Sequence, residues 1–148
     1  MKSVAVLIRS SVSRATKGKI VSRIIEELTV HIYLENEVYP EVRALLPEVE
    51  DDVLESYEKH HVADVLCMEL YAMKPDAERF DAKVKVLIEN GTHHIEEEEQ
   101  EWLPQVRQGL SRTQLRGIGA RLVEMRPSAP RSHAQPGALK TVVDAVIA

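Results

Sequence analysis

Residues 20–38 read IVSRIIEELTVHIYLENEV, and the spacing of their apolar side chains predicts a long helix. Apolar residues recur there at intervals of three and four, which places them on one helix face. That face ends in His31 and Glu35, so an imidazole and a carboxylate should lie side by side on the surface that packs into the core. The pattern occurs a second time, because His94 and Glu98 end the apolar face of a helix predicted over residues 76–102.

Two further helices complete the predicted architecture. One should follow Pro47 and stop at Pro75, and two adjacent apolar stripes along it leave open whether His60 or His61 faces the core. The other should cover residues 111–125, with Ser111 as its N-cap. We therefore expect an all-α, antiparallel helical bundle over residues 1–125, then a proline-rich linker over 126–138 and a short tail helix over 139–148.

The composition argues against several classes of protein. The chain has 148 residues, of which 44% are hydrophobic and 29% charged, as is typical of a globular domain. A formal net charge of −5 argues against nucleic acid as a partner. No stretch approaches the length of a transmembrane helix, so we expect no membrane partner. The single cysteine, Cys67, cannot form an internal disulfide and suits a reducing, cytoplasmic location.

The two His–Glu pairs are candidate metal ligands, because imidazole and carboxylate together suit iron, zinc or manganese. A single histidine on an apolar face is more often a hydrogen-bonded core residue. Here three helices each bring a histidine to the core, and burying these imidazoles with two carboxylates is costly without a cation. The set therefore favours a metal site, with His31, Glu35, His60, His61, His94 and Glu98 as candidate ligands.

Two other residues are weaker candidates, for a supporting role around such ligands. His93 pairs with Glu97 at the same spacing but lies beside the apolar face, and Tyr57 comes one turn before His60 and His61. Metalloprotease chemistry is not indicated, because the chain lacks a His-Glu-x-x-His sequence. A ferritin-type site needs two Glu-x-x-His pairs, and only one lies near the stripes, at residues 58–61.

Three phrases carry a resemblance to a known family. They are ELTVHIYLE at residues 27–35 with the Tyr-Pro that follows at 39–40, EKHHV at 58–62, and HHIEEEE at 93–99 with the Leu-Pro that follows at 103–104. In these phrases, and over residues 21–125 as a whole, the chain resembles the hemerythrin-like HHE cation-binding domains. The resemblance implies an antiparallel four-helix bundle around a non-heme di-iron site.

The resemblance also implies roles for individual residues. His31 and His94 would be iron ligands, and Glu35 and Glu98 would be bridging carboxylates. The single histidine that the family places on the middle helix corresponds to His60 or His61.

The chain departs from the family before His31. The resemblance implies a complete preceding helix that supplies a further iron-ligating histidine. Only thirty residues precede His31 and none is histidine, so we expect a shortened first helix, a stub around residues 4–12. Tyr57, water, a partner chain or a single-metal site could compensate for that ligand, and a truncated start of the sequence is an equal alternative.

The resemblance implies a protein that binds non-heme iron, in a complete or an incomplete di-iron site. Such a protein would bind oxygen, peroxide or nitric oxide, or sense iron. We expect a binding protein rather than an enzyme, although consumption of peroxide would differ from binding only by turnover. The alternative is a degenerate, metal-free bundle that acts as an interaction module. In this homodimer, a second copy of the chain would take the place of the missing first helix.

Overall fold

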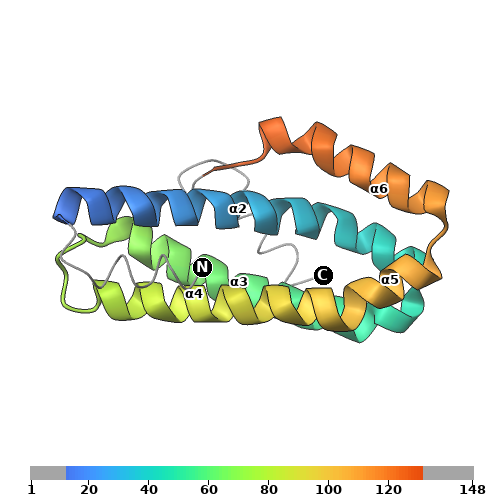
Figure 1. Cartoon of the computed structure of the whole chain (residues 1–148), viewed down its shortest axis with the longest axis horizontal. Coiled ribbons are helices and arrows are strands. Elements are labelled where there is room, and N and C mark those ends of the chain that lie inside the picture. Colours follow the sequence, from blue (N-terminus) through green and yellow to red (C-terminus); the bar gives the residue numbers. More distant parts are fainter. Residues whose placement is uncertain (1–12, 132–148) are drawn as a thin grey trace.

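The computed structural model describes residues 13–131, and within this range the chain forms helices and no strand, which confirms the predicted all-α bundle (Figure 1). The predicted stub at residues 4–12 and the predicted tail helix lie outside the described residues. No helix of residues 13–131 is both long enough and apolar enough to cross a membrane. The elements are α2 (Arg14–Leu45), the 3-10 turn η1 (Pro47–Val49), α3 (Glu50–Ala72), α4 (Phe80–Glu97), the π-helical turn η2 (Glu98–Trp102), α5 (Leu103–Gly109), α6 (Arg112–Met125) and the 3-10 turn η3 (Arg126–Ser128).

Helix α2 continues through Pro40, a residue that can bend or end a helix. A proline inside a helix removes one backbone hydrogen bond and crowds the preceding turn. The buried side chains of Tyr39 and Val42 hold α2 in the core on both sides of Pro40. The helix therefore ends only at Leu45.

Helix α4, the turn η2 and helix α5 form one continuous helical rod that widens at η2. Pro104 has no N–H to donate to the carbonyl of Gln100, and its ring would clash with that carbonyl in a regular α-helix. The preceding turn opens into π-helical hydrogen bonding, in which Leu103 N–H donates to Glu98 O. The rod therefore continues past Trp102, where the sequence predicted an end, and Glu98 is the first residue of the widened turn.

The helices α2, α3 and the α4–α5 rod pack as an antiparallel bundle (Figure 1). Arg43 near the end of α2 pairs with Glu50 at the start of α3, with the two atoms 2.5 Å apart. Asn36, earlier on α2, pairs with the later His60 of α3. Lys83 near the start of α4 pairs with Glu69 late in α3, whereas the earlier Lys59 pairs with Glu97 at the end of α4. Each helix therefore reverses the direction of the one before it.

Two large apolar cores lie along the bundle, separated by a layer of polar residues, and a smaller apolar cluster lies between α2 and the residues after α6. On α2 the first core extends to Ile32 and the second begins at Val38. The first core surrounds the fully buried Leu87, and the second surrounds the fully buried Val53. Between the cores lie the buried polar side chains of what we call the polar layer: Asn36, His60, His94 and Glu98, with the partly buried Glu35.

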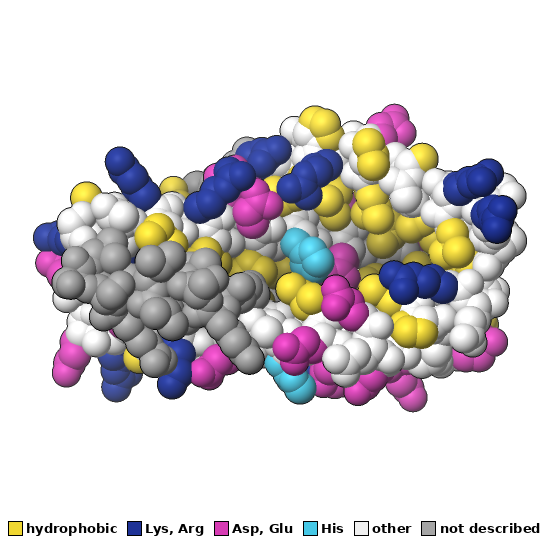
Figure 2. Space-filling model, in the orientation of Figure 1, with side chains coloured by type: hydrophobic (Ala, Val, Ile, Leu, Met, Phe, Trp, Pro, Cys, Tyr) yellow, Lys and Arg dark blue, Asp and Glu magenta, His cyan; other side chains and the backbone are white. Residues whose placement is uncertain are grey.

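Helix α6 covers the second core as a fourth helix. It runs antiparallel to α2, because Arg121 pairs with Glu41 whereas the later Arg126 pairs with the earlier Glu27 (3.3 Å). Figure 2 shows hydrophobic side chains at the surface between α6 and the other helices. The contact is therefore incomplete, and the apolar edge predicted for α6 packs against the second core while staying only partly buried; its residues are Leu115, Ile118 and Leu122.

The chain after α6 turns back onto α2. Ala129 is 4% exposed and packs with Val30 and Leu34 of α2. Arg131 pairs with Glu26 at 3.3 Å. The described first residues of the predicted linker therefore lie against the bundle.

The predicted N-cap of α6 is confirmed, and its removal should destabilise the helix. Ser111 Oγ accepts from Gln114 N (3.1 Å), and Gln114 Oε1 accepts from Ser111 N (2.8 Å), which together form a capping box. We expect Ser111→Ala to lower the free energy of unfolding of α6 by about 1 kcal/mol, read by amide hydrogen exchange. Thr113→Ala, in the exposed first turn, is the control, and equal exchange in the two variants would contradict the prediction.

Candidate metal centre

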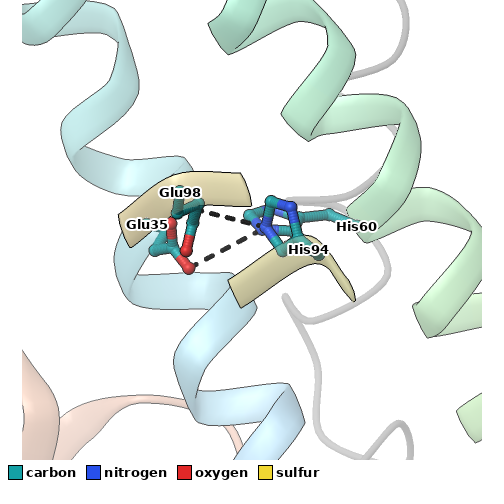
Figure 3. A group of neighbouring side chains, drawn as sticks. All are labelled: Glu35, His60, His94 and Glu98. Atoms are coloured by element: carbon teal, nitrogen blue, oxygen red, sulfur yellow. Dashed lines mark hydrogen bonds and ion pairs between the residues drawn. The ribbon is translucent and has the colours of Figure 1, made fainter. Parts of the chain in front are cut away.

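Four side chains with metal-ligating atoms meet in the polar layer. Glu35 comes from α2, His60 from α3, and His94 and Glu98 from the α4–α5 rod, and one ligating atom of each lies within 4.8 Å of the others. In Figure 3 the two carboxylates face the two imidazoles. His60, His94 and Glu98 are 2%, 6% and 5% exposed, so the group is shielded from water. We call these four side chains the His–Glu group.

His60 is held in the form that binds metals. Its Nδ1 lies 2.8 Å from Asn36 Oδ1, and an amide oxygen only accepts, so Nδ1 carries the proton. Nε2 then carries the lone pair and accepts a hydrogen bond from His94 Nε2, 3.0 Å away, with Glu35 Oε1 at 3.8 Å. Burial, followed by the neighbouring imidazoles of His94 and His31, lowers the pKa of His60 to about 3, so the ring is neutral at pH 7.

The two carboxylates differ in how readily they ionise. Burial, together with the charge of Glu98, raises the pKa of Glu35. Burial also opposes ionisation of Glu98, but its contacts with His94, Glu35 and Tyr39 outweigh burial and lower its pKa. Two buried carboxylates so close together repel when both are charged, and a bound cation would relieve this repulsion.

The hydroxyl of Tyr39 lies between these carboxylates. It donates to Glu35 Oε2 at 2.5 Å and lies 3.0 Å from Glu98 Oε1. Tyr39 is 1% exposed, and burial, followed by the charges of Glu35 and Glu98, raises the pKa of its hydroxyl well above the ordinary value. The hydroxyl therefore stays protonated and acts as a donor.

His31 joins the His–Glu group through Glu35. Its Nε2 contacts Glu35 Oε1 across one turn of α2. Both atoms are buried, and neither makes a hydrogen bond of acceptable geometry with a described residue. These two buried atoms are in contact but lack hydrogen bonds, and a cation bound by both would satisfy them.

The separations also suit a cation. Ligands of one transition-metal ion lie about 2.0–2.2 Å from it, so two of them are at most about 4.4 Å apart. The ligating atoms of the His–Glu group lie within 4.8 Å of one another, so small movements of the side chains would bring them to the distances of a metal site. Nitrogen and oxygen donors in this mixture suit iron, manganese or zinc rather than calcium or magnesium.

Three residues singled out in the sequence lie apart from the His–Glu group. His61 is partly buried and is not one of its four members, whereas its neighbour His60 is. The side chain of His93 is 68% exposed and pairs with Glu97 at 2.9 Å. Tyr57 lies edge-on against Tyr39, with ring centroids 5.2 Å apart, and is not one of the four members of the group.

Asn36 and Tyr39 surround the group but were not among the sequence candidates. Tyr39 follows Glu35 by four residues, so the same helical spacing that paired His31 with Glu35 also places Tyr39 on this face. Asn36 carries no comparable signal, because its role depends on which α3 histidine lies opposite.

A surface pocket of about 340 Å³ reaches the site at His31. The side chain of His31 is 41% exposed, whereas the other two histidines of the site are buried. Glu27 pairs with both Arg23 (2.9 Å) and Arg126 (3.3 Å) and thereby joins α2 to the residues after α6. The pocket is lined by Arg23, Ile24, Glu27, Leu28, His31, Ile95 and Arg126.

Comparison with known proteins bears on the bundle from α2 to the start of α5, and not on α6. The family model described as the hemerythrin HHE cation-binding domain matches residues 4–106. No curated protein and no solved structure matches the chain significantly.

Proposed function

Because this chain belongs to the hemerythrin HHE cation-binding domain family, we propose that it binds non-heme iron in its polar layer, as a di-iron or a single-iron site. With that iron it would bind oxygen, peroxide or nitric oxide, or sense iron itself. The observation that carries the proposal is the meeting of two imidazoles and two carboxylates from three helices within 4.8 Å.

Five residues would hold the iron: His31, Glu35, His60, His94 and Glu98. Iron bound there would supply Lewis acidity and redox chemistry at coordination positions that the protein leaves open. The chain's own contribution is to orient the ligands and exclude water. Asn36 keeps Nε2 of His60 unprotonated, and burial shields three of the five ligands.

Reconstitution with ferrous iron under anaerobic conditions tests this proposal. After desalting, metal analysis should find about one or two iron ions per chain. Exposure to air should then produce the absorption bands of an oxo-iron centre. A protein that keeps no iron and shows no such bands would contradict the proposal.

The pocket at His31 supports small-ligand binding, because it connects solvent with the exposed edge of the proposed site. We expect Ile24→Trp to fill the pocket and to slow the binding of nitric oxide to the ferrous protein severalfold, as measured by stopped-flow absorption. The iron content should not change. Val86→Trp, at a residue of α4 that is 51% exposed, is the matched control. Equal rates in the two variants would show that ligands enter elsewhere.

A further inference from the structure

The hydroxyl of Tyr39 touches carboxylates from two different helices. Glu35 belongs to α2 and Glu98 to η2, and their nearest oxygens lie 2.5 Å and 3.0 Å from the hydroxyl. A phenol that is 1% exposed would be unfavourable in this core without such partners. The contact therefore ties together two helices at the level of the polar layer.

Three aromatic neighbours fix the ring of Tyr39. His60 stacks on it, with centroids 5.6 Å apart and planes inclined by 12°. Tyr57 and Trp102 meet it edge-on, at centroid distances of 5.2 Å and 5.6 Å. A ring packed on several sides leaves its hydroxyl little freedom, so the position of the donor is set by the core.

The hydrogen bond also determines which oxygen of Glu35 is free. Tyr39 binds Oε2, and Oε1 is left facing the imidazoles of His31 and His60. Glu98 Oε1 lies between the Tyr39 hydroxyl and His94 Nε2, which is 3.2 Å away. The hydroxyl is thus placed to orient both carboxylates toward the histidines.

We propose that Tyr39 is a positioning residue that holds Glu35 and Glu98 in the orientation needed to bind one metal centre together. This inference rests on the proposed function, because the carboxylates are oriented for a bound cation. A phenylalanine would fill the same space in the core, so the role belongs to the hydroxyl and not to the ring.

The test compares Tyr39→Phe with Tyr57→Phe, the same change in the neighbouring ring. Dissociation constants for ferrous iron are measured by competition with a chromophoric chelator, alongside thermal unfolding of each protein without metal. We expect Tyr39→Phe to weaken iron binding by about 10- to 100-fold, as is typical when a hydrogen bond to a ligand is lost. Tyr57→Phe should bind like the unchanged protein, because its ring lies beyond Tyr39.

Each other outcome overturns the inference in a distinguishable way. Equal affinity of Tyr39→Phe and the unchanged protein would remove any role for the hydroxyl. Equal weakening in both variants would indicate a packing effect. A visible phenolate-to-iron band in the ferric protein that Tyr39→Phe abolishes would make Tyr39 a ligand. If the unchanged protein itself bound no iron, the proposed function would fail first, and this inference with it.

Discussion

Replacing His94 by alanine should abolish iron retention, whereas replacing its neighbour His93 should leave it intact. His94 Nε2 lies 3.0 Å from His60 Nε2 and 3.2 Å from Glu98 Oε1, so its loss removes a donor from the centre of the His–Glu group. The loss of iron affinity should exceed the roughly 10- to 100-fold loss that is typical when a residue that only supports a ligand is replaced. Iron content after anaerobic loading and desalting measures it.

The adjacent histidines of α3 supply a second matched pair for the same experiment. His60→Ala should lose iron as His94→Ala does, because Nε2 of His60 faces the group. His61→Ala should retain it, because His61 is not a member of the group. Retention by all four variants would mean that iron binds outside the His–Glu group, and loss in His61→Ala would contradict the assignment of His60.

Iron should stabilise the fold by a large amount. Without a cation, the polar layer buries two carboxylates of like charge beside imidazoles, and a metal that binds only the folded state shifts the folding equilibrium. At free iron about 1,000 times the dissociation constant, the gain is about 4 kcal/mol, which corresponds to a midpoint higher by roughly 10 °C for a chain of this size. Thermal unfolding followed by circular dichroism under anaerobic conditions measures it.

A chelator and a ligand variant serve as controls for this shift. Adding a chelator should return the midpoint to that of the metal-free protein. His94→Ala should show the same midpoint with and without iron. A shift that persists in His94→Ala would mean that iron binds elsewhere on the chain.

The helices and the candidate ligands followed from the spacing of side chains in the sequence. The face that includes Leu28, His31 and Glu35 repeats at the helical period, and the family match now supports the bundle. Ser111 as the N-cap of α6 followed from its hydroxyl side chain at the predicted start of the helix, and the structure adds Gln114 to form a capping box. These features are local, because they depend on residues within a turn or two of each other.

Features that depend on packing between helices could not be predicted in this way. His60 and His61 are adjacent in sequence, and only the rotation of α3 against α2 brings His60 to Asn36. Tyr39 meets Glu98 because two distant helices pack side by side at the same level. The π-helical turn likewise combines a local cause, Pro104, with a core that keeps the rod continuous on both sides.

If iron occupies the polar layer as proposed, we expect the cooperativity of the bundle to depend on that iron. The polar layer separates the core around Leu87 from the core around Val53, so we expect the middle of the bundle to be its least stable cross-section when no cation is bound. Each half could then open separately, as segments joined by few apolar contacts do. With iron bound, the same cross-section becomes a junction that links all three long helices. We therefore expect a protease to cleave the iron-free protein faster than the iron-bound protein, because the iron-free bundle opens as two separate halves.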